Sequence, residues 1–316
     1  MPDVVTLGET MALFSPRDAG PLRYVTEFRL RFGGAETNFA IALARLGISV
    51  GWISRLGHDE FGRLIAHHLR GEGVDTSRVI TDRERSTAIY VKERRAAGDP
   101  SVYYYRRSSA ASALCPDDIE ESYVAGARWL HITGITPALS PSCHAAVTRA
   151  IDIARANGAR VSMDPNLRLK LWSIEQARET LLPMFRRCHV LLGGDSELEL
   201  LLQTRSPEQS AAWALDAGLE VAVVKLGSAG ALVATAGRSA TAPPFPVEVV
   251  VDSIGAGDGF DAGFVHGMLG GRDPWEAARI GNAVAVHALQ VDGDYEGFPT
   301  RSELDAFMQG QETVKR

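Results

Sequence analysis

A glycine-rich turn, Gly255-Ala256-Gly257, is the part of this chain best suited to bind a charged ligand. It follows the β-branched run Val249–Val251 and precedes a segment with Phe260, Phe264 and Met268 at helical spacing. Glycine lets a backbone approach a ligand closely, and the first turn of a helix presents unpaired N–H groups and the positive end of the helix dipole. The pattern therefore predicts a strand, an anion cradle and a helix, in that order, and the usual anion is phosphate.

Asp258 lies in the first turn of this predicted helix. A carboxylate there suits the helix dipole, so an ordinary helix-start residue is one interpretation. The other is a base, because phosphoryl transfer requires an oxygen nucleophile beside a site that stabilises negative charge. Competing motifs are absent from the sequence. It has no G-x-x-x-x-G-K-[ST], and Phe260 stands where G-x-G-x-x-G/A requires Gly or Ala.

The segments that must position this turn alternate between strand-like and helix-like patterns. Helices are predicted at Glu36–Leu46 and Asp59–Leu69 from apolar residues at helical spacing. Apolar runs predict strands at Val4–Leu7, Val50–Ser54, Trp129–Thr133, Val161–Met163, Val190–Leu192 and Val221–Lys225. Strands separated by helices imply β-α-β units, and hence an α/β fold whose central sheet is mostly parallel and covered by helices on both faces.

One part of the chain departs from this alternation. Ser86–Glu93 and Ser101–Arg107 are extended runs on either side of Ala-Ala-Gly-Asp-Pro, which predicts a β-hairpin with a long loop. The region from about Thr10 to Phe32 is neither helical nor linked to a parallel strand. We therefore expect one domain over residues 1–316, with a small antiparallel layer built from segments at about 10–33 and 84–112.

Composition excludes several classes of protein. The 316 residues carry a net charge of −6, which does not favour a nucleic-acid partner. No run reaches the roughly 18 apolar residues of a membrane span, and the N-terminus lacks the pattern of a signal peptide. The three cysteines form no C-x-x-C pair. These features predict a cytoplasmic protein with no membrane association.

The segment Asp252–Phe260 resembles the C-terminal signature of the ribokinase-like (PfkB) carbohydrate kinases, D-T-x-G-A-G-D-x-F. Ser253 replaces the threonine and keeps its hydroxyl. The segment Gly33–Ala40 is similar to the family's N-terminal signature, a Gly-Gly followed by a helix that carries Asn. The order of segments agrees along nearly the whole chain, and the predicted hairpin resembles the family's β-lid. The resemblance implies the ribokinase-like fold.

The resemblance also implies a set of roles. Asp258 would deprotonate the substrate hydroxyl, and the N–H groups around Gly255, Ala256 and Gly257 would form the anion hole. Glu197 would order Mg²⁺ through water, although Gly194 stands where the family's N-x-x-E motif has Asn. The residues implied for ATP binding are Asn166, Arg168, Gly194, Lys225, Gly227, Ser228, Gly230, Gly255, Gly257 and Asn282. ATP and Mg²⁺ are the implied cofactors, and a monovalent cation is left open.

Within the family, three stretches resemble the 2-keto-3-deoxygluconate kinases. They are Tyr104-Tyr105-Arg106 with Ser109–Ser112, Asp164–Arg168 with Leu171-Trp172, and Gly293–Gly297. The implied reaction is phosphorylation of the 6-hydroxyl of this sugar acid. Arginine is the side chain best shaped to hold a carboxylate, and Tyr104 and Arg106 share one face of their strand. The residues implied for sugar binding are Gly34, Asn38, Tyr90, Tyr104, Arg106, Arg168 and Asp294.

Several alternatives stay open. A fructokinase, ribokinase or nucleoside kinase would share Asp258 and the anion hole without a carboxylate clamp. A non-catalytic sugar or nucleotide sensor could use the same fold. Tyr103–Tyr105 also fits a set of strand aromatics with no ligand. The small-molecule partners expected are a sugar acid and ATP, and the exposed edges of the lid predict a homodimer that pairs through it.

Overall fold

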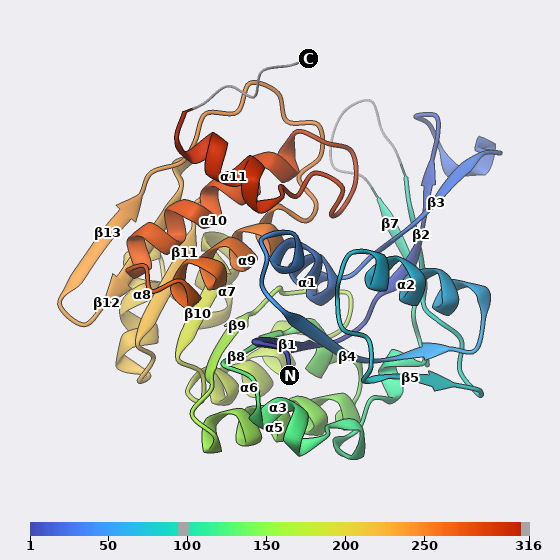
Figure 1. The fold of residues 1–316 in the computed structure, drawn as a ribbon, viewed down its shortest axis with the longest axis horizontal. Coiled ribbons are helices and arrows are strands. Elements are labelled where there is room, and N and C mark those ends of the chain that lie inside the picture. Colours follow the sequence, from blue (N-terminus) through green and yellow to red (C-terminus); the bar gives the residue numbers. More distant parts are fainter. Residues whose placement is uncertain (94–100, 311–316) are drawn as a thin grey trace.

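The larger of the two sheets has nine strands, in the order β13-β12-β11-β10-β9-β8-β1-β4-β5 (Figure 1). It belongs to a computed structural model in which residues 1–93 and 101–310 are described. Neighbouring strands are parallel from β5 to β11, and β12 and β13 are added antiparallel at one edge. The strands are β1 Val4–Leu7, β4 Val50–Gly57, β5 Val79–Asp82, β8 Trp129–Thr133, β9 Arg160–Asp164, β10 Val190–Gly194, β11 Val221–Lys225, β12 Ala231–Thr235 and β13 Arg238–Ala242.

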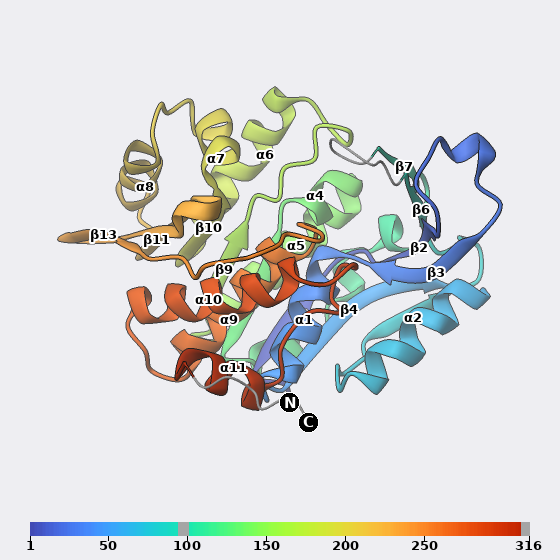
Figure 2. The same cartoon turned by 90° about the horizontal axis from the view of Figure 1, so that it is seen from above.

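Helices cover both faces of this sheet (Figure 2). One core contains apolar side chains of α3, α5, α6, α7 and α8, and the other contains those of α1, α2, α9, α10 and α11. The helices are α1 Ala35–Arg45, α2 Glu60–Gly71, α3 Glu121–Ala125, α4 Ile135–Leu139, α5 Pro141–Ala156, α6 Ile174–Phe185, α7 Asp195–Leu202, α8 Pro207–Asp216, α9 Ala256–Leu269, α10 Pro274–Leu289 and α11 Arg301–Met308. The predicted α/β architecture with a mostly parallel sheet is confirmed. Among the helices of the described part of the chain, none has the length and apolar character needed to span a bilayer.

A second, four-stranded sheet has the order β3-β2-β6-β7 and stands beside the end of the main sheet (Figure 1). Its strands are β2 Met11–Pro16, β3 Phe28–Gly33, β6 Ile89–Lys92 and β7 Val102–Tyr105. The β2–β3 and β6–β7 pairs are antiparallel, as expected, and the central β2–β6 pair is parallel. We call this sheet the lid. The Ala-Ala-Gly-Asp-Pro stretch of the predicted hairpin lies outside the described residues.

The strand predicted at Val249–Val251 is wrong. These valines are 67%, 58% and 54% exposed and lie in a loop between β13 and α9. Only a bond from the Val251 N–H to the Leu289 carbonyl ties the run to its surroundings in the described backbone. A β-branched run has strand propensity, but it needs a neighbouring strand to pair with. Here β12 and β13 already form that edge of the sheet, so α9 begins after a loop.

Helices α9 and α10 pack with their backbones in contact. A Cβ at Gly263 would lie 2.9 Å from the Gly281 Cα, and one at Gly281 would lie 2.8 Å from the Phe260 carbonyl oxygen. Glycine is therefore required on both sides of the crossing. Because α9 carries Asp258 in its first turn, this contact also fixes where that carboxylate lies.

We predict that Gly263→Ala lowers the free energy of unfolding by about 1–3 kcal/mol, because the added methyl group has no room at the crossing. The matched control is Gly71→Ala in α2, where a Cβ meets no atom within 4 Å. That change should raise stability by about 0.5–1 kcal/mol. Urea unfolding of both variants checks the pair, and equal effects would contradict the close-contact explanation.

Candidate active site

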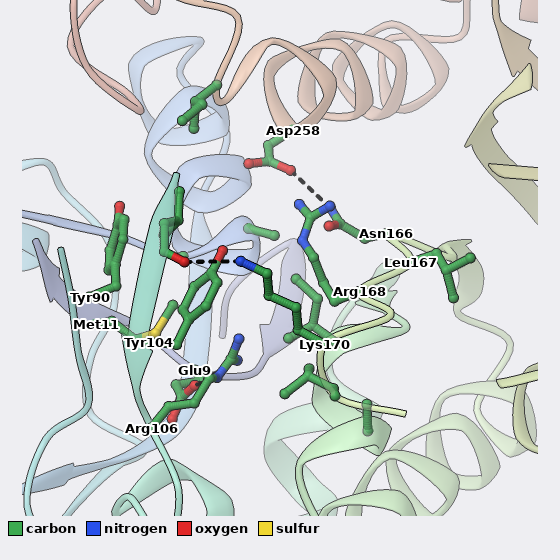
Figure 3. A pocket seen from close by; sticks show the side chains of 18 of the residues that line it. Glu9, Met11, Tyr90, Tyr104, Arg106, Asn166, Leu167, Arg168, Lys170 and Asp258 are labelled. Carbon is green, nitrogen blue, oxygen red and sulfur yellow. Dashed lines mark hydrogen bonds and ion pairs between the residues drawn. The ribbon is translucent and has the colours of Figure 1, made fainter. Parts of the chain in front are cut away.

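A cavity of about 1520 Å³ lies between the carboxyl ends of the central strands and the lid (Figure 3). This is where ligands bind in open α/β sheets, because loops from several strands converge there. The predicted site residues that line it are Gly34, Asn38, Tyr90, Tyr104, Arg106, Asn166, Arg168, Gly194, Glu197, Lys225, Gly227, Gly255, Gly257, Asp258 and Asp294. The structure thus brings together positions that are more than 250 residues apart in the chain.

Asp258 faces this cavity from the first turn of α9 and is held by two amides. Asn38 Nδ2 donates to its Oδ2 at 2.8 Å, and Asn166 Nδ2 donates to its Oδ1 at 3.4 Å. Burial raises the pKa of Asp258 to about 7, while the Asn38 hydrogen bond opposes that rise. A carboxyl group with a pKa near neutrality can accept a proton from a ligand hydroxyl and later release it.

The N-terminus of α9 lies where the sequence predicts an anion cradle. Gly255 precedes the helix in the left-handed region, with φ of 80°, and no side chain caps the first turn. A Cβ at Gly255 would lie 1.8 Å from the Asp294 carbonyl oxygen, so only glycine fits there. The free N–H groups and the open approach at Gly257, which lines the cavity, suit the phosphates of a nucleotide.

Lys225 lies beside this cradle, at the end of β11. Its Nζ donates to Asp164 Oδ2 at 2.8 Å and to Asp261 Oδ1 at 3.0 Å. Burial alone would lower the pKa of Lys225, but the two carboxylates raise it above its ordinary value, so the ammonium stays charged. A Cβ at Gly257 would be 3.6 Å from this Nζ. The roles of Asp164 and Asp261 were missed from the sequence, although Asp261 follows Asp258 by one helical turn.

Glu197 and Gly194 lie at the junction of β10 and α7. Glu197 Oε1 accepts the Leu167 N–H, and its Oε2 accepts the Gly194 N–H at 3.4 Å. Burial, and then the charge of Asp164, raise the pKa of Glu197 to about 7. Gly194 has φ of −70°, and a Cβ there would meet only Glu197 atoms at 3.9 Å. Neither strain nor crowding therefore requires glycine at this position.

The lid contributes a stacked aromatic pair. The rings of Tyr90 and Tyr104 lie 6.0 Å apart and are inclined by 22°. The Tyr90 hydroxyl donates to Asp294 Oδ2 at 2.6 Å. Burial raises the pKa of Asp294 to about 6, and the bond from Tyr90 opposes this. The lid is also tied to the loop before the cradle, because Lys92 Nζ lies 2.5 Å from Asp252 Oδ2.

Arg106 follows β7 and lies over the Tyr104 ring, with its Cζ 5.5 Å from the centroid. The predicted shared face of these residues is thereby confirmed. Its Nε and Nη2 both contact Glu9 Oε2, at 2.7 and 2.6 Å. The other oxygen of Glu9 accepts the Ser109 hydroxyl. Sequence reasoning missed Glu9, and its only signal was an acidic residue between two apolar strands.

Three buried oxygens in the cavity have no hydrogen-bond partner among the residues that the structure describes. They are the Oδ1 atoms of Asn38, Asn166 and Asp294. Asn166 also has φ of 38°, a left-handed conformation that is costly for a residue with a side chain. Buried acceptors without donors are normally satisfied by a ligand or water, so these atoms are candidate contacts for the hydroxyl groups of a ligand or for water.

Four predicted residues are not among those that line the cavity: Ala256, Ser228, Gly230 and Asn282. Asn282 Nδ2 donates to the carbonyls of Ala242 and Pro243, at 3.2 and 2.9 Å. Gly230 has φ of 91°, and a Cβ there would lie 2.3 Å from the Ala242 carbonyl oxygen. These two residues shape the chain after β13, and their roles in nucleotide binding stay predictions.

Comparison with known proteins agrees with this geometry. The model of the pfkB family carbohydrate kinases matches residues 1–301. The chain is 38% identical to the 2-dehydro-3-deoxygluconokinase of Bacillus subtilis, over 99% of this chain and 97% of that protein. It is 36% identical to the enzyme of the same name from Thermoproteus tenax, over 98% of this chain and 94% of that one.

A similar solved structure contains bound ligands. The putative ribokinase II of E. coli, in complex with ATP and Mg²⁺, superposes with a TM-score of 0.92. It shares 27% identity, and the match covers 98% of this chain and all of that one. The family model matches almost the whole sequence, and Asp258, the start of α9 and the lid line one cavity. The chain therefore belongs to the pfkB family of carbohydrate kinases and is an ATP-dependent sugar kinase.

Proposed function

We propose that the protein transfers the γ-phosphoryl group of ATP to the 6-hydroxyl of 2-keto-3-deoxygluconate, the sugar acid also called 2-dehydro-3-deoxygluconate. The observation that carries the proposal is the placement of Asp258, at the N-terminus of α9, in a cavity whose opposite wall is the Tyr- and Arg-bearing lid. The names of the two curated relatives support this substrate.

In the proposed reaction, Asp258 accepts the proton of the sugar hydroxyl as its oxygen attacks the γ-phosphorus. The new O–P bond forms while the bond to the β-phosphate oxygen breaks, and ADP leaves. The N–H groups at the start of α9 stabilise the charge on the transferred group. The Lys225 ammonium lies beside the start of this helix, 3.6 Å from where a Cβ at Gly257 would be. Asn38 holds the carboxylate of Asp258 by its 2.8 Å bond and keeps it aimed at the cavity.

The residues of the cavity fit a nucleotide with its magnesium ion. Within residues 1–93 and 101–310, no group of three or more acidic, His or Cys side chains could hold a metal unaided. Mg²⁺ keeps several waters and binds readily through phosphates. We therefore propose that Glu197 contacts it only through water, and that ATP phosphates supply the direct ligands. When bound, the ion would neutralise phosphate charge.

A kinase for a neutral sugar is the second candidate, and one observation favours it. Two nitrogens of Arg106 are already held by the buried Glu9 carboxylate. A neutral hydroxyl could use the remaining Nη1 without needing a net positive charge nearby. The sensor interpretation is not retained, because the family match and the kinase-named relatives show a sugar kinase.

A substrate panel separates these candidates. ADP release with Mg·ATP should be strong with 2-keto-3-deoxygluconate and weak with gluconate, fructose, ribose and adenosine. Phosphorus–proton coupling in the NMR spectrum of the product should place the phosphate on carbon 6. A higher kcat/KM for a neutral sugar would replace the acid assignment, and coupling at another carbon would overturn the proposed position.

The role of Asp258 predicts both a mutational and a pH effect. Asp258→Asn should lower kcat by about 10²–10⁴-fold, because no base remains. In the parent enzyme, the carboxylate exists only above its pKa, so kcat/KM should rise with pH around a midpoint near 7. Asn38→Ala removes a bond that stabilises the charged form, so its midpoint should be higher. A midpoint that stays fixed in Asn38→Ala would argue against Asp258 as the titrating group.

We further propose that the protein forms a homodimer that pairs through the lid. We also propose that it is cytoplasmic. The edge strands β3 and β7 expose Phe28, Leu30, Tyr103 and Tyr105, which are 38%, 44%, 48% and 68% exposed. The three cysteines are free thiols, which suits a reducing compartment.

Light scattering should give about twice 34.1 kDa for the parent protein, and Leu30→Lys should shift it toward the monomer mass. Leu200 in α7 is 42% exposed, so Leu200→Lys is a matched control that should leave the dimer intact. A monomeric parent would remove this proposal.

A further inference from the structure

We propose that Lys170 binds the carboxylate of the sugar-acid substrate and sets the preference for an acid over a neutral sugar. This inference rests on the proposed function and assigns a residue that the sequence motifs did not single out. Lys170 lies in the loop after β9 and lines the cavity. Figure 3 shows its side chain reaching from that loop toward Tyr104 of the lid.

The charge balance of the cavity points to this residue. The Arg106 guanidinium is neutralised by the fully buried Glu9, and the Lys225 ammonium is matched by Asp164 and Asp261. Neither of these cations therefore offers net positive charge to an incoming anion. A carboxylate that leaves water needs a counter-charge as well as hydrogen-bond donors.

Lys170 has no carboxylate partner within residues 1–93 and 101–310, and its ammonium group is held in a defined place. Its Nζ donates to the Val102 carbonyl oxygen of β7 at 3.0 Å, and that acceptor is uncharged. The same Nζ lies 5.6 Å from the centroid of the Tyr104 ring, whose other cationic neighbour is Arg106 at 5.5 Å. An ammonium group has three protons, so two remain for a ligand. A carboxylate beside Tyr104 can thus meet both Lys170 and Nη1 of Arg106, which has no partner among the described residues.

Arg168 and Arg107 are the other cations of the cavity without a carboxylate partner in the described part of the chain. Arg168 turns with Asn166 toward Asp258 in Figure 3, and its charge lowers the pKa of Asp258. That position suits the phosphoryl group being transferred. Arg107 lines the cavity, but no contact in the described structure fixes its guanidinium. Lys170 is therefore the cation both unmatched and anchored at the lid.

The shape of the substrate agrees with this placement. In a six-carbon sugar acid, the 6-hydroxyl and the C1 carboxylate are at opposite ends. When the hydroxyl lies at Asp258, the carboxylate extends away from the cradle toward the lid. Between these ends, Asp294 Oδ1 and Asn38 Oδ1 are buried acceptors that lack donors among the described residues, and they suit the hydroxyls of the middle carbons.

The test compares 2-keto-3-deoxygluconate with its C1 amide, which has nearly the same shape and no charge. Parent, Lys170→Met and Lys170→Arg enzymes are assayed for kcat and KM with both compounds. Lys170→Met should lower the acid-over-amide ratio of kcat/KM by about 10- to 100-fold, the range expected for a hydrogen bond to a charged group. The loss should appear in the KM of the acid, and Lys170→Arg should retain most of the ratio.

The remaining outcomes separate a carboxylate-binding role from a structural one. If the lost bond to Val102 only loosens the lid, both compounds suffer equally and the ratio is unchanged, which overturns the inference. A loss of the ratio in Arg107→Met, with Lys170→Met unaffected, would also overturn it and assign the role to Arg107. A parent enzyme without any preference for the acid would overturn the proposed substrate, and this inference with it.

Discussion

The ion pairs of Lys225 with Asp164 and Asp261 are the contact on which the site depends. Asp164 ends β9, Lys225 ends β11 and Asp261 lies in α9, so one ammonium joins the carboxyl edge of the sheet to the helix that carries Asp258. Removing one partner of such a buried set leaves an uncompensated charge, which is strongly destabilising. The cluster therefore holds α9 at the edge where the nucleotide loops converge, and the glycine contact with α10 fixes the helix from its other side.

A second constraint is that one carboxylate, that of Asp164, influences the pKa of several neighbouring groups at once. Asp164 pairs with Lys225, but its charge also raises the pKa of both Glu197 and Asp258. Asp258 is in turn held by amides from α1 and from the loop after β9, which donate to different oxygens of its carboxylate. The pKa of Asp258 thus depends on several elements packed together, and no single one of them determines it.

Much of this arrangement could be predicted from the sequence, because it depends on local patterns. The Gly255–Asp258 turn, the alternating strands and helices, and the Tyr104–Arg106 face follow from spacing and backbone chemistry. The partners of buried charges could not be predicted, since Glu9 meets Arg106 across 97 residues and Lys225 meets Asp164 across 61. The strand prediction at Val249–Val251 was wrong for a related reason, because an apolar run forms a strand only where another strand is free to pair with it.

Asp294 contacts both the lid, through Tyr90, and the turn before α9, through Gly255. Its side chain accepts the Tyr90 hydroxyl of the lid, while its backbone oxygen lies where any side chain at Gly255 would have to go. A change in the loop that carries Asp294 would therefore disturb the phosphate cradle as well. Substitutions at Asp294 are therefore constrained by Gly255, whereas the three described atoms nearest to a Cβ at Gly255 all belong to Asp294 and none belongs to the lid. Diversification of substrate range, in nature or by directed evolution, is accordingly expected to proceed through substitutions in the lid and in the facing loop.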